Sequence, residues 1–258
     1  MVNVEVRGKA APQISGCGTP ESVWRHCATL GQLPEFTLPK CAFAVVFAPH
    51  PDDETLGLGG TIATLLDRGS TVLVMTASDG EASHPRSATT SPAQLRERRE
   101  EELRGALQTL SEGRPGHALN VKLHLPDGGL DQVERQLSEH LLRFLDSDVL
   151  CFSTWAHDGH PDHEAVGRAA RSACARSGSR LIEYPVWTWH WAVPNKDNVP
   201  WWRAQKLNLS PRTLNTKRNA IQRYESQISP LSNWPGDEAV VPPFDLDHFG
   251  RNFEVLFA

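Results

Sequence analysis

Four side chains that can ligate a metal or move a proton stand close together at His50, Asp52, Asp53 and Glu54. They directly follow the apolar run 42–47, which predicts a buried strand, and strand ends of open α/β sheets are where ligands bind. Crowded carboxylates raise each other's pKa, and a cation relieves that repulsion. His and Asp together form a ligand set suited to zinc or a similar divalent metal.

A second cluster of the same residue types follows another short apolar run, Asp148–Phe152. His157, His160 and His163 recur there at every third position, among further carboxylates. Two strand ends loaded in this way predict one metal site with three protein ligands and an open position, which is the catalytic pattern for zinc. The spacing alone leaves open which of the three histidines binds the metal.

The composition narrows the class of protein. A chain of 258 residues forms one large domain or two small ones. The net charge of -5 argues against general nucleic-acid binding, which needs a basic face. No apolar run approaches the roughly 20 residues of a membrane span. The five cysteines have no metal-site spacing and the N-terminus has no secretory pattern, so we expect reduced thiols and a cytoplasmic protein.

Short apolar runs alternate with amphipathic segments from residue 41 onward, which predicts an α/β fold with a mostly parallel sheet flanked by helices. Residues 1–40 are expected to form an N-terminal arm or cover, with a short helix near 21–30, on a single domain at 41–258. The tail from Ser229 is expected to be an ordered surface segment. The expected strands are 42–47, 71–76, 121–124, 148–152 and 181–184, the expected helices are 55–68, 91–111, 130–145 and 161–177, and 205–228 should add a strand and a helix.

Five of the eight tryptophans fall between residues 187 and 202. This Trp-rich C-terminal extension predicts either a packing surface against the main sheet or an aromatic wall beside the site, on which a sugar ring could stack. Gly57, Gly59 and Gly60 do not have the dinucleotide-binding spacing, which argues against a nucleotide-dependent oxidoreductase.

The motifs together resemble those of the PIG-L/LmbE-like family of zinc-dependent N-deacetylases. The resemblance covers about residues 42–185. It implies a Rossmann-like core, a bound zinc (with another divalent metal such as Fe2+ as the alternative), and removal of an acyl group from N-acetylglucosamine-type amides. The motifs that carry it are A-P-H-P-D-D-E at 48–54, S-D-G-E at 78–81, R-E-E-E-L-R-G-A-L at 99–107, L-P-D-G-G-L at 125–130 and H-P-D-H at 160–163.

Carried over by position, the resemblance makes His50, Asp53 and His163 the metal ligands. It makes Asp52 the general base and His160 the group that stabilises the oxyanion or protonates the leaving amine. Amide hydrolysis needs a nucleophile at neutral pH, and a metal supplies one by lowering the pKa of bound water to about 7.

Further residues receive roles from the resemblance or from their positions in the expected elements. Asp127 falls where the family contacts a sugar hydroxyl, and Arg99, on a family helix near the site, is expected to bind substrate with it; Glu102 lies on the same helix. Asp158 stands where some members have a tyrosine. Glu54 is expected at the helix end or behind His50, while Asp162 and Glu164 are expected to be structural, and the remaining histidines surface or core residues, at 84, 117, 124, 140, 190 and 248.

The sequence therefore predicts a metal-dependent hydrolase that removes an N-acetyl or other N-acyl group from an amino sugar in a small molecule, glycolipid or glycoconjugate. An amidase for a larger or non-sugar substrate is the alternative within the same class. From a different class, a non-catalytic metal- or sugar-binding module is the alternative, although such a protein has no need of Asp52 beside Asp53. A second dense ligand set for a two-metal phosphoesterase is not visible.

Overall fold

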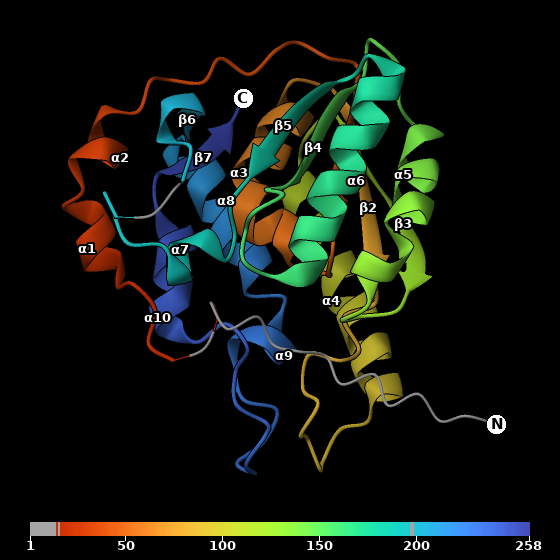
Figure 1. The fold of residues 1–258 in the computed structure, drawn as a ribbon, viewed down its shortest axis with the longest axis vertical. Coiled ribbons are helices and arrows are strands. Elements are labelled where there is room, and N and C mark those ends of the chain that lie inside the picture. Colours follow the sequence, from red (N-terminus) through yellow and green to blue (C-terminus); the bar gives the residue numbers. More distant parts are fainter. Residues whose placement is uncertain (1–13, 15, 197–198) are drawn as a thin grey trace.

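The computed structural model of the chain describes residues 14, 16–196 and 199–258, and it contains the expected α/β fold (Figure 1). One seven-stranded sheet runs in the order β3-β2-β1-β4-β5-β7-β6. The strands are β1 (Phe43–Ala48), β2 (Thr71–Ser78), β3 (His117–Leu125), β4 (Leu150–Thr154), β5 (Arg180–Tyr184), β6 (Ala204–Asn208) and β7 (Phe253–Phe257).

The first five strands pair in parallel, and β1 lies between β2 and β4. The chain leaves β1 toward β2 and β3, then returns to the other side of β1 with β4. This reversal of direction opens a crevice beyond the carboxyl ends of β1 and β4, which is the usual ligand site of such sheets.

Alternate residues of β1 enter two separate cores, as the two-residue period of a strand requires. Val45 and Phe47 pack on the face covered by α5 and α6, whereas Ala44 and Val46 pack on the face covered by α3, α4 and α8. Figure 1 shows α5 and α6 together on one side of the sheet. The helices are α3 (Asp53–Asp67), α4 (Pro92–Ser111), α5 (Glu134–Leu142), α6 (Pro161–Ser177) and α8 (Pro211–Ile221).

Two helices begin as their capping residues predict. Ser91 accepts a hydrogen bond from the Gln94 amide, and the Gln94 side chain accepts one from the Ser91 amide, which completes a capping box on α4. Pro161 is the first residue of α6, and His160 is its N-cap. The N-cap position brings His160 to the end of β4, next to the ends of the other central strands.

The expectation that the tail from Ser229 is a surface segment is wrong. Its last part is β7, which inserts between β5 and β6 in antiparallel orientation, and Leu256 and Phe257 are fully buried. The charged Glu254 interrupts this apolar run, but its carboxylate is buried against Lys217 at 2.7 Å and accepts the Gly60 amide hydrogen. The tail also forms α9 (Glu225–Ile228), α10 (Pro243–Leu246) and the 3-10 turn η4 (Asp247–Gly250).

The N-terminal segment packs against the Trp-rich region. It forms α1 (Glu21–Arg25) and α2 (Ala28–Gln32), and Trp24 is fully buried with its ring 5.1 Å from that of Trp189 and 5.7 Å from that of Trp201. Much of the Trp-rich region therefore serves packing. Within the described residues, no helix is long and apolar enough to cross a membrane.

Candidate active site

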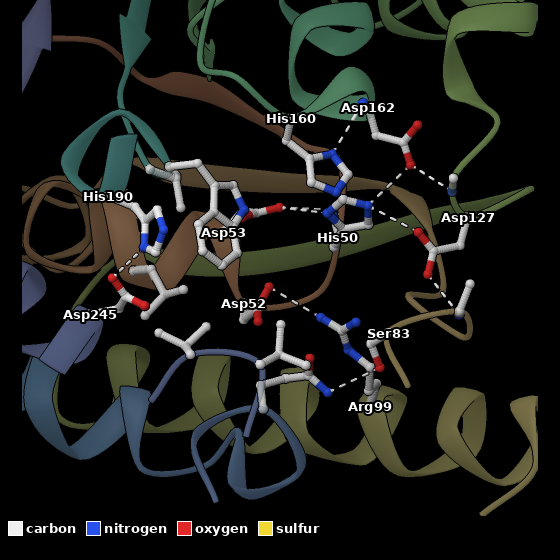
Figure 2. A pocket seen from close by; sticks show the side chains of 18 of the residues that line it. His50, Asp52, Asp53, Ser83, Arg99, Asp127, His160, Asp162, His190 and Asp245 are labelled. Carbon is white, nitrogen blue, oxygen red and sulfur yellow. Dashed lines mark hydrogen bonds and ion pairs between the residues drawn. The ribbon is translucent and has the colours of Figure 1, made fainter. Parts of the chain in front are cut away.

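A cavity of about 430 Å³ opens beyond the carboxyl ends of β1 and β4. The loop after β1 and the first turn of α6 meet there, as the strand order requires (Figure 2). The sequence-predicted site residues that line it are His50, Asp52, Asp53, Arg99, Asp127 and His160. His163 is fully buried, within reach of Asp53.

Three donor atoms converge at the bottom of this site. The Nδ1 of His50 lies 3.1 Å from Asp53 Oδ2, and the Nε2 of His163 lies 3.3 Å from the same oxygen. The His163 Nε2 is buried and has no hydrogen-bond partner among the described residues. Two imidazole nitrogens and one carboxylate oxygen within 4.8 Å of one another fit a divalent metal of the zinc type.

Each of the two histidines has its other ring nitrogen held by carboxylates. The Nε2 of His50 lies 3.1 Å from Asp127 Oδ1 and 3.2 Å from Asp162 Oδ2. The Nδ1 of His163 lies 2.9 Å from Asp158 Oδ2. A carboxylate that accepts the proton of one ring nitrogen leaves the other nitrogen free to bind a metal. His50, His160 and Asp162 form a second candidate ligand group. We interpret the contact of Asp162 with His50 Nε2 as one that orients His50 so that its Nδ1 can bind a metal in the first group.

Asp52 occupies a strained position between the ligands and α4. Its φ of 130° is unusual for a residue with a side chain, and such backbone strain, on the order of 1–3 kcal/mol, collects at functional sites. The Arg99 guanidinium lies 3.2 Å from Asp52 Oδ1 and donates to the backbone carbonyls of Pro51 and Gly80. Burial raises the pKa of Asp52 to about 8, with Arg99 opposing the rise and Asp53 adding to it.

His160 lies beside both histidine ligands, with its ring centroid 5.0 Å from that of His50 and 4.9 Å from that of His163. Its Nδ1 accepts a hydrogen bond from the Asp162 amide at 3.2 Å. Burial and the positive charges of the neighbouring histidines lower the pKa of His160 to about 3. The ring is therefore neutral near pH 7, with its proton on Nε2.

Charge is strongly concentrated around the ligands. Burial opposes protonation of His50 and His163, but the surrounding carboxylates outweigh it, so the pKa of His50 lies well above its usual value and that of His163 rises to about 9. The same contacts overcome burial at Asp53 and Asp127 and hold both carboxyl pKa values well below their usual range. The carboxylates around His50 and His163 therefore stabilise positive charge at this position, as a cation-binding site must.

A family model described as "PIG-L: GlcNAc-PI de-N-acetylase" matches residues 45–174, which is half of the chain and includes both motif clusters. The chain belongs to this family. The family match thus confirms the resemblance seen in the sequence, and it ends before the Trp-rich region and β7.

Curated PIG-L relatives match over part of their length. A 1D-myo-inositol 2-acetamido-2-deoxy-alpha-D-glucopyranoside deacetylase of Mycobacterium sp. (strain JLS) is 30% identical over 175 residues, which is 58% of this chain and 54% of that protein. A diacetylchitobiose deacetylase of Thermococcus kodakarensis is 30% identical over 138 residues, which is 50% of this chain and 48% of that protein. The chain spans about half the length of these relatives.

Solved structures share the fold over most of the chain. A conserved protein of Thermus thermophilus is 25% identical with a TM-score of 0.56, covering 81% of this chain and 85% of that one. The zinc-inhibited form of teicoplanin deacetylase Orf2 is 17% identical with a TM-score of 0.59, covering 83% and 97%. The N,N'-diacetylchitobiose deacetylase of Pyrococcus horikoshii is 22% identical with a TM-score of 0.53, covering 73% and 72%.

Sequence reasoning missed Asp158 as part of this PIG-L site. Besides holding His163, its fully buried carboxylate accepts hydrogen bonds from the backbone amides of Val186, Trp187 and Thr188. It thereby ties the start of the Trp-rich region to the metal ligands. The resemblance drew attention to Asp158, but the sequence could not show what that aspartate contacts.

Several residues considered from the sequence lie away from the ligands. His157 is exposed and packs beside Trp155. Glu54 is fully buried, but its carboxylate accepts hydrogen bonds from the Asp52 amide and from Tyr224. Glu102 joins α4 to the start of α9 by accepting hydrogen bonds from Ser226, so its role is in packing.

Proposed function

We propose that this chain is a zinc-dependent hydrolase that removes the N-acetyl group from an amino sugar, with His50, Asp53 and His163 as the metal ligands. One observation carries the proposal: three ligand atoms converge at the wall of one cavity that is also lined by Asp52, a carboxylate outside the ligand group. Curated relatives named as deacetylases of acetamido sugars support the substrate class.

The ligand set leaves room for a reacting water. When bound, a divalent cation of this kind lowers the pKa of a coordinated water and polarises a carbonyl oxygen. Asp52 lines the same cavity beside the ligand group, where its carboxylate is placed to take a proton from such a water and to return it. Arg99 fixes the orientation of Asp52 through one carboxylate oxygen, so we assign Arg99 to positioning.

His160 is proposed to act on the carbonyl oxygen of the reacting amide. Because its Nδ1 accepts the Asp162 amide hydrogen, its Nε2 carries a hydrogen that can form a hydrogen bond to the developing oxyanion. The water oxygen forms the new bond to the acetyl carbon as its proton passes to Asp52. The bond from carbon to nitrogen then breaks as Asp52 returns that proton to the leaving nitrogen, which gives the free amine and acetate.

Asp127 is proposed to contact a sugar hydroxyl at the edge of the cavity. Its Oδ1 faces His50 and its Oδ2 accepts the Ala82 amide hydrogen at 2.7 Å, and carboxylates accept several hydrogen bonds at once.

All five cysteines are free thiols, which supports the proposal that the enzyme works in the cytoplasm.

The decisive experiment is amine release from a panel of N-acetylglucosamine derivatives by purified protein, before and after chelation and again after zinc is restored. Release that chelation abolishes and zinc restores supports the proposal. N-propionyl and N-butyryl analogues in the same panel test the alternative of a larger acyl group. Protein that binds stoichiometric zinc but releases no amine from any member would contradict the deacetylase assignment.

A further inference from the structure

Asp52 is held at its backbone as well as at its side chain. It is the N-cap of α3, and its φ of 130° and ψ of -34° differ from the extended conformation that N-cap residues usually adopt. Its carbonyl accepts the amide hydrogens of Thr55 and Leu56, so the helix fixes the peptide that follows it. A strained conformation of this kind persists only where the surrounding contacts enforce it. The contact at the Asp52 amide must therefore supply part of that constraint.

The Asp52 amide donates to a side chain in the first turn of the same helix. The acceptor is Oε2 of Glu54, at 3.1 Å, and both residues are buried. A backbone amide can only donate, so Glu54 is the acceptor whether its carboxyl group is ionised or protonated. The contact resembles half of a capping box, in which the N-cap residue is normally extended. Here it serves a strained N-cap whose side chain lines the cavity.

The other oxygen of Glu54 is held from the C-terminal half of the chain. Tyr224, which joins α8 to α9, contacts Glu54 Oε1 through its hydroxyl, and Thr55 Oγ1 donates to the same oxygen at 2.5 Å. A hydroxyl can both donate and accept, so the Tyr224 contact holds in either protonation state of Glu54. Tyr224 is 1% exposed and lies outside the residues that match the family. A carboxyl group held at both oxygens cannot turn away from the Asp52 amide without breaking these bonds.

The segment that carries Tyr224 is itself tied to α4. The amide and the hydroxyl of Ser226 donate to the two oxygens of Glu102, at 2.8 and 2.7 Å. Arg99, also on α4, lies 3.2 Å from Asp52 Oδ1, and Figure 2 shows the two side chains facing each other. One helix thus supports both contacts of Asp52. It holds the carboxylate through Arg99, and it anchors the segment from which Tyr224 reaches Glu54.

We propose that Glu54 and Tyr224 are positioning residues for Asp52: Tyr224 fixes the Glu54 carboxyl group, which holds the Asp52 amide and with it the backbone conformation that directs the Asp52 side chain into the cavity. This inference rests on the proposed function, in which Asp52 is the general base. Release of the amide would let φ relax toward the usual N-cap range, and rotation about the bond from N to Cα would move the side chain relative to the ligand group. The position of the base then depends on a residue outside the family-matched half.

The two tyrosines of the chain give a matched pair of variants, because both are buried. The Tyr184 ring packs against Gly57 of α3, and its hydroxyl has no hydrogen-bond partner in the part of the chain that the structure describes. Tyr224→Phe in the zinc-loaded full chain should lower kcat about three- to tenfold, with KM and zinc content unchanged, since Thr55 still holds part of Glu54. Tyr184→Phe, the same chemical change, should leave kcat unchanged. Equal kcat values in the two variants would overturn the proposal.

A double variant separates positioning from support of the fold. Glu54→Leu alone leaves the Tyr224 hydroxyl buried without a partner, whereas Glu54→Leu with Tyr224→Phe makes both partners apolar and should recover most of the stability in urea unfolding. The kcat of the double variant should stay about 10- to 100-fold below wild type, because the Asp52 amide still has no acceptor. Glu54→Gln, which keeps an oxygen that can accept this amide, should retain most of kcat. Recovery of kcat together with stability in the double variant would mean that the pair only supports the fold.

Hydrogen exchange tests the contact without turnover. In the zinc-loaded protein the Asp52 amide, followed by NMR, should exchange at least about tenfold faster in the double variant than in wild type, and at the wild-type rate in Tyr184→Phe. If exchange responds in this way but the wild type releases no amine, the deacetylase proposal is wrong and the holding of Asp52 by Glu54 stands. If amine is released and neither exchange nor kcat distinguishes Tyr224→Phe from Tyr184→Phe, the positioning proposal is wrong and the deacetylase proposal stands.

Discussion

Histidines on both sides of the cavity have one ring nitrogen that contacts a carboxylate. The other ring nitrogen faces the candidate metal position in His50 and His163, whereas it has no hydrogen-bond partner among the described residues in His190 and His248. At the end of β1 and the start of α6 the free nitrogens of His50 and His163 converge on Asp53. On the opposite side, Asp245 Oδ1 lies 2.9 Å from His190 Nδ1 and 4.0 Å from His248 Nε2, but these residues form no three-ligand group in the described part of the chain. The pairing of histidine with carboxylate is therefore common to both sides, and what distinguishes the metal side is three ligand atoms within 4.8 Å of one another.

The two sides also differ in how the chain builds them. The metal side lies at the switch point of five parallel strands, where short turns leave little freedom. The far side, which carries His190, Asp245 and His248, is assembled from α7 (Thr188–Trp191), α10, η4 and the N-terminal α1, and it is joined by contacts of His190 with Asp245 and of His248 with Glu21. The first arrangement follows from the core fold of the family, and the second is a property of this chain's own extension.

Replacement of Asp52 should have the largest effect, because it removes chemistry and leaves both sides of the cavity built. Asp52→Asn should lower kcat by about 10²- to 10⁴-fold, the usual contribution of a general base. Zinc content, measured by elemental analysis, should stay at the wild-type level because Asp52 lies outside the ligand group. Loss of zinc in this variant would show that Asp52 and Asp53 have been assigned in the wrong order.

Asp158 tests whether the carboxylate behind a metal ligand matters as the geometry indicates. Asp158→Asn should weaken zinc binding about 10- to 100-fold, since outer carboxylates orient the ligand and raise its basicity. The measurement is competition with a fluorescent chelator, which is independent of turnover. Asp245→Asn is the matched control, because Asp245 holds a histidine in the same way on the side without a ligand group. Equal losses in the two variants would contradict the distinction between the two sides.

The far side should depend on pH through Glu21. Burial opposes ionisation of this carboxyl, but hydrogen bonds from His248 and Arg251 outweigh it and lower the pKa to about 2 from 4.5. A carboxyl whose pKa is depressed by folding contributes stability above its unfolded pKa, and this contribution is lost as the pH falls through its folded pKa. The difference in unfolding free energy between wild type and Glu21→Gln should therefore shrink by about 1–2 kcal/mol from pH 6 to pH 3.

Urea unfolding of both proteins at each pH gives this difference directly. Zinc should be kept saturating at pH 6 and its occupancy checked at each lower pH, so that metal loss is not mistaken for the carboxyl effect. A difference that stays constant, or grows, as the pH falls would mean that Glu21 is not held as an anion by His248 and Arg251.

The fold of the family-matched half could be predicted because its signals are local. Apolar runs indicated β1, β2 and β4, and Ser91 with Pro92 indicated the start of α4. The strand β7 could not be predicted in the same way, since Glu254 interrupts its apolar run. That carboxylate is buried only because Lys217 and the amides of Gly60 and Thr61 meet it, and all of them are distant in sequence.

The candidate site divides along the same line. His50, Asp52 and Asp53 are adjacent in sequence, so their shared location followed from one motif. The contacts of Asp158 with His163 and of Asp245 with His190 depend on tertiary structure, and His190 and His248 looked like ordinary surface or core histidines. Sequence spacing reports which residues can share a strand end, but not which carboxylate finds which ring nitrogen.

The smallest effect is expected at Asp127, because the His50 nitrogen that it holds has a second carboxylate partner. Asp162 Oδ2 lies 3.2 Å from the same Nε2, and the Asp162 carboxylate accepts hydrogen bonds from the Gly128 amide at Oδ2 and the Leu130 amide at Oδ1. Asp127→Asn should therefore weaken zinc binding only a few-fold. Asp158→Asn should weaken it more, because Asp158 is the one carboxylate partner of His163 Nδ1 among the described residues. If Asp127 also contacts a sugar hydroxyl, KM for N-acetylglucosamine should rise by more than the change in zinc binding explains, and this is measured at saturating zinc. A loss of zinc affinity as large as that of Asp158→Asn would show that Asp162 does not share the support of His50.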